Sequence, residues 1–134
     1  MLTPPDITES EWKVMKLLWT KSPQPAYDLI TALAENEEWH QNTVKTLLSR
    51  LLKKKAIGAR KYKNLYLYHP LVSQDDCVRV ETQTFLQRIF GGSVKPLLVH
   101  FLKHEKLSGA EIEELKRILN ENDGRKKGSS KEKT

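Results

Sequence analysis

The sequence predicts a mainly α-helical protein that contains one small β-hairpin. Apolar residues recur every three or four positions in six separate segments, which is the period of a helix with one buried face. Aromatic and branched residues alternate over residues 59–69, which is the period of a strand. The first 72 residues therefore follow the order helix, helix, helix, hairpin, which is the order of a winged helix-turn-helix domain.

The first predicted helix begins at Thr8. Glu11, three residues later, completes a Thr-x-x-Glu capping box, in which each residue hydrogen-bonds the backbone amide of the other. The Ser-Pro-Gln-Pro segment at 22–25 ends this helix and forms a short polar link, because proline cannot continue a helix. The apolar stripe of the helix contains Trp12, Met15 and Trp19.

Two further helices are predicted at residues 26–37 and at about 40–54. Leu29, Ile30 and Leu33 give the first of them its apolar period. The inner stripe of the second contains Val44, Leu47, Leu48 and Leu51. Its opposite face is polar and free of acids.

Positive charge is concentrated between the third helix and the hairpin. Residues 39–74 contain no Asp or Glu, but they contain eight Lys and Arg side chains. Periodic apolar residues combined with charge of one sign indicate a folded surface that faces phosphate. The alternative is a helix face that simply meets solvent, although such faces usually mix the two signs.

The hairpin is predicted from strands at 59–63 and 65–69. Lys63 and Asn64 form the tight turn between them, and Pro70 ends the second strand.

Three more helices follow, beginning at Ser73, Ser93 and Ser108, and the last has a capping box with Glu111. We therefore expect a DNA-binding domain at 1–72, a helical dimerisation domain at 73–122 and a basic disordered tail at 123–134. The tail is rich in Lys, Ser and Gly.

The short C-terminal helices carry apolar stripes that they cannot bury alone, which predicts a homodimer. The alternative is that they fold back onto the first domain as one monomeric core. The expected interface contains Val78, Phe85, Leu86, Ile89, Leu97, Leu98, Phe101, Leu102, Ile112, Leu115 and Leu119.

Other functional classes have little support in the sequence. A single cysteine, Cys77, excludes an intrachain disulfide, and neither a signal peptide nor a membrane span is visible, so a cytoplasmic protein is expected. No nucleophile motif, phosphate loop or catalytic carboxylate pair predicts an enzyme or a cofactor. His100 and His104 have the i, i+4 spacing of metal ligands, but without a third ligand we expect no metal site.

Three stretches, ITESEWKVMKLLW, WHQNTVKTLLSRLLKKKAI and YLYHPLVS, resemble the penicillinase and methicillin-resistance repressor family (BlaI/MecI). The resemblance covers about residues 6–120. It implies a dimeric repressor that binds palindromic operators in front of genes for a β-lactamase or other resistance proteins. It also implies relief of repression through a membrane metallopeptidase sensor, with cleavage in the dimerisation domain. The matching bond here is His100–Phe101, where His replaces the Asn of the family.

In this arrangement the third helix enters the major groove, where base edges carry a full donor and acceptor code. We expect Thr43, Lys45 and Thr46 to reach bases, flanked by Asn42 and Ser49. Arg50, Lys53 and Lys54 are expected to contact phosphate, and the wing to add Arg60, Lys61 and Lys63.

The resemblance also marks departures. Relatives usually have Gly where this chain has Lys55, so the helix exit is expected to differ. At the wing tip, Lys63-Asn64 replaces a common Gly-Arg, and Asn64 is expected to suit the turn. Two rival functions remain open, namely a winged helix that binds protein and a DNA binder without sequence preference.

Overall fold

The computed structural model describes residues 4–133, with side chains described from residue 4 through Asp123. The chain divides into two compact units, one up to Phe85 and one from Leu86. The functional boundary expected at 72/73 stays a prediction, because compact units need not coincide with functional domains. Cys77, in the helix that follows this boundary, is buried in the core of the first unit.

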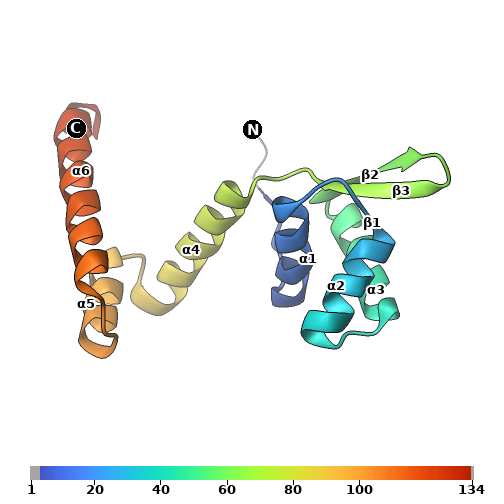
Figure 1. Cartoon of the computed structure of the whole chain (residues 1–134). Helices are drawn as coiled ribbons and strands as arrows, with labels where there is room; N and C mark the ends of the chain where they lie inside the picture. The colour runs from blue at the N-terminus through green and yellow to red at the C-terminus, as the bar shows by residue number, and fades with distance from the viewer. Residues whose placement is uncertain (1–3, 134) are drawn as a thin grey trace. The chain divides into compact units, whose positions relative to one another are not determined.

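The first unit contains three helices: α1 (Glu9–Thr20), α2 (Ala26–Glu37) and α3 (Gln41–Lys53) (Figure 1). The Thr8–Glu11 capping box expected for α1 is present. The apolar stripes of the three helices meet in one core, as their period predicts. Its fully buried large side chains include Met15, Leu18, Leu29 and Leu51.

A three-stranded antiparallel sheet completes this unit. Strands β2 (Ile57–Tyr62) and β3 (Leu65–Pro70) form the expected hairpin. A third strand, β1 (Gln24–Pro25), pairs with β3, so the strand order is β1-β3-β2. The segment predicted as a polar link is therefore part of the sheet. The indole Nε1 of Trp19 donates to the carbonyl of Val72 over 2.9 Å, which joins α1 to the end of the wing.

Two left-handed residues differ from the sequence expectations. The exit of α3 is a Schellman motif in which Lys55 has φ 63°, and the amide of Ala56 donates to the carbonyl of Leu51. Lys55 thus adopts the conformation that glycine would adopt, and the exit is not reshaped. At the wing tip the left-handed residue is Lys63, with φ 56°, rather than Asn64.

Helix α4 (Gln74–Phe90) begins in the first unit, with the Ser73 hydroxyl accepting from the amide of Asp76. The second unit contains the end of α4, then α5 (Val94–His104) and α6 (Gly109–Lys133). Ser108 and Glu111 form the expected capping box. Helix α6 extends into the segment expected to be a disordered tail. The side chains of residues 124–134 lie outside the described ones, so the tail's disorder stays a prediction.

Candidate nucleic-acid interface

The outer face of α3 gathers most of the predicted DNA-contacting residues. His40 caps the helix, its Nδ1 accepting from the amide of Asn42 over 3.1 Å. Because Val44, Leu47, Leu48 and Leu51 are buried, the helix is fixed with its polar residues outward. The outer face of α3 consists of the exposed side chains of Asn42, Thr43, Lys45, Thr46, Ser49, Arg50 and Lys53.

The start of α1 contributes to the same surface. A groove beside the outer face of α3 is lined by Thr8, Ser10, Asn42, Thr43, Thr46, Leu47 and Arg50. Thr8 and Ser10 were not expected at this surface. Their sequence signal is that of a helix start, and only the packing of α1 against α3 brings them beside Thr43 and Arg50.

The wing presents its cations in more than one direction. Arg60, Lys61 and Lys63 are all exposed. In the β2–β3 ladder Arg60 is paired with Leu67 and Lys61 with Tyr66. Neighbouring residues of a strand point to opposite faces, so Arg60 and Lys61 cannot contact the same phosphate group side by side. The Lys63 ammonium lies 5.5 Å from the centre of the Tyr62 ring, near the tip.

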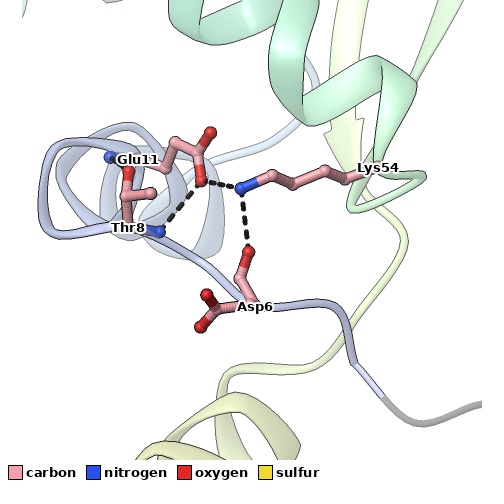
Figure 2. Close-up of polar contacts among 4 residues, drawn as sticks. All are labelled: Asp6, Thr8, Glu11 and Lys54. Carbon is pink, nitrogen blue, oxygen red and sulfur yellow. Dashed lines mark hydrogen bonds and ion pairs between the residues drawn. The ribbon is translucent and has the colours of Figure 1, made fainter.

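Lys54 is the predicted contact that the structure places elsewhere. Its Nζ donates to Glu11 Oε1 over 2.5 Å and to the carbonyl of Asp6 over 2.8 Å (Figure 2). Arg50 and Lys53, by contrast, are exposed on the outer face of α3. The last turn of α3 therefore offers phosphate two outward cations and turns a third inward, toward the start of α1.

Glu11 is fully buried, and its environment favours the charged carboxylate. Burial alone raises the pKa of Glu11, but hydrogen bonds from Lys54 and Thr8, together with the charge of Lys54, outweigh it and lower the pKa below its usual value. The carboxylate is thus ionised at neutral pH. Its negative charge lies inside the protein. The outer face of α3 carries only cationic and uncharged side chains.

Three other kinds of feature bear on function, namely metal ligands, the cysteine thiol and membrane-spanning helices. Within the described residues, no group of three or more His, Cys, Asp or Glu side chains is arranged to hold a metal ion. His100 and His104 lie with ring centres 4.6 Å apart on α5. Burial raises the pKa of the Cys77 thiol, which favours its unreactive neutral form. In the described part of the chain, no helix is long and apolar enough to cross a membrane.

The expected dimer residues are mostly exposed. Leu102 is 60% exposed and Leu119 56% exposed in the second unit, whereas Leu86 is buried and Leu97 half-buried. Val78 and Phe85 belong to the first unit. The others that remain exposed are Ile89, Leu98, Phe101, Ile112 and Leu115. His100 and Phe101 lie within α5.

Comparison with known proteins agrees with this geometry. The sequence profile of the penicillinase repressor family matches residues 7–121. The penicillinase repressor of Bacillus licheniformis is 35% identical over 92% of this chain and 96% of its own length. The methicillin resistance regulatory protein MecI of Staphylococcus aureus strain N315 is 33% identical over 86% of this chain and 94% of its own.

A solved structure of a relative matches just over half of this chain. It is the solution structure of monomeric Bacillus licheniformis BlaI in complex with the blaP half-operator, with 32% sequence identity and a TM-score of 0.51. The match covers 57% of this chain and 93% of that one. The family consists of transcriptional repressors rather than enzymes. The chain belongs to the penicillinase repressor family and has the winged-helix DNA-binding fold of that family.

Proposed function

We propose that this repressor binds a palindromic operator as a homodimer, with α3 of each protomer in the major groove. The observation that carries the proposal is the outer face of α3, whose seven exposed side chains include three cations and no acid. Thr43, Lys45 and Thr46 lie in its first turns, where side chains reach base edges. Arg50 and Lys53 follow toward its C-terminal end, where they suit phosphate.

The wing and the start of α1 extend this contact. Arg60 or Lys61 contacts the backbone beside the groove, and Lys63 reaches further along it from the tip. Ser10 lies at the edge of the groove beside Arg50, within the first turn of α1. The hydroxyl of Ser10 can donate to a phosphate oxygen, so this edge could add a second contact with the DNA backbone.

Homodimerisation is supported by the exposed apolar residues of α5 and α6. Large exposed apolar surfaces on a small protein mark contact sites, and a two-fold axis suits a palindromic site. We propose that the protein acts in the cytoplasm on a β-lactamase or related resistance operon. Cleavage at His100–Phe101, triggered by a membrane metallopeptidase sensor, would separate the helices that hold the dimer.

The test is fluorescence anisotropy with DNA from the protein's own upstream region and with scrambled DNA, each at several salt concentrations. A specific repressor binds its own site about a thousandfold or more tightly, and the affinity falls steeply with salt. Equal binding to both would favour a DNA binder without sequence preference. No binding at low salt would favour a protein-interaction module instead.

A further inference from the structure

Glu11 is the only charged side chain that is fully buried among the described residues. Its Oε1 accepts from the backbone amide of Thr8 over 2.9 Å and from Lys54 Nζ (Figure 2). Its Oε2 is also buried and has no hydrogen-bond partner within the described residues. Burying a carboxylate is costly unless it is paired, so Lys54 is the group that makes this buried charge tolerable.

Lys54 occupies a particular place on α3. It is the C-cap residue of the helix, and its amide donates to the carbonyl of Arg50. Its side chain crosses to α1 and to the preceding segment, where it meets Glu11 and the carbonyl of Asp6. The end of α3 is therefore attached by directional polar bonds to the start of α1, 43 residues earlier in the chain.

Among the described residues, α1 and α3 also share the apolar core of the first unit. The inner stripe of α3 is made of Val44 and leucines, whose contacts are non-directional and pair no specific polar atoms across the two helices. A buried ion pair adds little net stability to a fold, yet it specifies one geometry, because any displacement leaves a buried charge unpaired. A rotation of α3 would move Thr43, Lys45 and Thr46 together relative to the bases.

We propose that Glu11 and Lys54 are positioning residues that fix the angle and register of α3 for base reading, and that Lys54 contacts no phosphate. The inference rests on the proposed sequence-specific DNA binding. The two adjacent lysines at the end of α3 then have different roles. Lys53 acts on the DNA backbone, whereas Lys54 acts through Glu11 on the orientation of the whole helix.

The first experiment separates the roles of Lys53 and Lys54. The salt dependence of operator binding is measured for wild type, Lys53→Met and Lys54→Met. Loss of a phosphate contact lowers the slope of log affinity against log salt by about one. We expect that decrease for Lys53→Met and an unchanged slope for Lys54→Met. An equal decrease for Lys54→Met would overturn the inference.

The second experiment keeps the fold intact while removing the ion pair. In Glu11→Gln/Lys54→Met no buried charge remains, and Gln still serves the capping box with Thr8. We expect unchanged affinity for scrambled DNA and at least about tenfold weaker binding to the operator. The single variant Lys54→Arg keeps a cation opposite Glu11, so it should retain most of the operator preference that the double variant loses.

The outcomes distinguish this inference from the proposed function. If the double variant is folded by circular dichroism and retains the full operator preference, the ion pair does not position α3 and the inference fails. If wild type itself shows no preference for its operator, the proposed function fails first. Should Lys54→Met unfold, the double variant alone decides the positioning role, and its salt slope decides the phosphate contact.

Discussion

At the scale of single residues, Lys55 has a conformation that suits another amino acid. It is left-handed, with φ 63°, at the position of the Schellman motif that glycine usually occupies. Replacing Lys55 with Gly removes the steric cost of that conformation and keeps the hydrogen bonds of the motif. We expect Lys55→Gly to raise the free energy of unfolding by about 1 kcal/mol, measured by urea denaturation.

A matched control is available two residues earlier. Lys53 is the last residue of α3 and has helical geometry. Glycine there should lower stability by about 0.5–1 kcal/mol, because glycine loses more backbone freedom in a helix. If both substitutions destabilise the protein equally, the left-handed conformation of Lys55 is not strained in solution.

We expect Glu11 to contribute to the response of stability to acid. Its pKa is lowered in the folded protein below the usual 4.5. For a lowered pKa, the stabilisation is fully present above the unfolded value and is lost as the pH falls through the folded value. Urea denaturation between pH 6 and 3 should therefore show a steeper loss of the free energy of unfolding for wild type than for Glu11→Gln, which lacks this titrating carboxyl group.

Parallel curves for the two proteins would contradict that assignment. Glu111 is a useful reference because its pKa is also lowered, by hydrogen bonds from Ser108, but it is exposed in α6. Solvent screens an exposed group, so Glu111→Gln should alter the acid response less than Glu11→Gln.

At the scale of elements, we expect substitutions on α3 to have two kinds of effect, depending on whether the residue reads bases or contacts phosphate. Lys45 lies in the base-reading turns and Arg50 near the C-terminal end, both exposed on the outer face of α3. Lys45→Ala should cost about 1–3 kcal/mol at one base position and relax preference there. Arg50→Ala should weaken operator and scrambled DNA alike and lower the salt slope by about one. Anisotropy with single-base operator variants measures both effects, and uniform weakening by both would refute these roles.

The elements also show what a sequence can reveal. Capping boxes at Thr8 and Ser108 and the apolar period of α3 are local signals, and the structure confirms the helices they predict. Strand β1 was missed because two residues with proline gain a strand only through pairing with β3. The pairing of Lys54 with Glu11 was missed for the same reason, since a bond across 43 residues depends on packing and leaves no spacing to find.

At the scale of the whole molecule, the proposed DNA contact and the proposed dimer interface belong to different parts of the chain. Leu102 is exposed in α5, so Leu102→Lys should leave the protomer folded while placing a charge in the proposed interface. We expect the variant to sediment as a monomer and to bind the full operator at least about a hundredfold more weakly, because it loses the linked second contact.

Binding to an isolated half-site is the control for that variant. It should be unchanged, since the outer face of α3 lies in the other unit. Lys103→Ala, an exposed change at the neighbouring position of α5, should remain dimeric. A dimeric Leu102→Lys protein would remove α5 from the proposed interface.

The proposed cleavage would use the same separation, because a cut in α5 lies outside the first unit and within the proposed dimer interface. His100 stands where the resemblance places Asn, and the bond lies inside a helix that must open before a peptidase can hold it in extended form. If side-chain identity limits cleavage, His100→Asn should be cut faster than wild type in cells that carry a sensor peptidase and receive a β-lactam. Immunoblotting and N-terminal sequencing of the fragments measure the rate and the site. Phe101→Ala should slow the cut, and equal rates for all three proteins would mean that the bond is chosen by access rather than by its side chains.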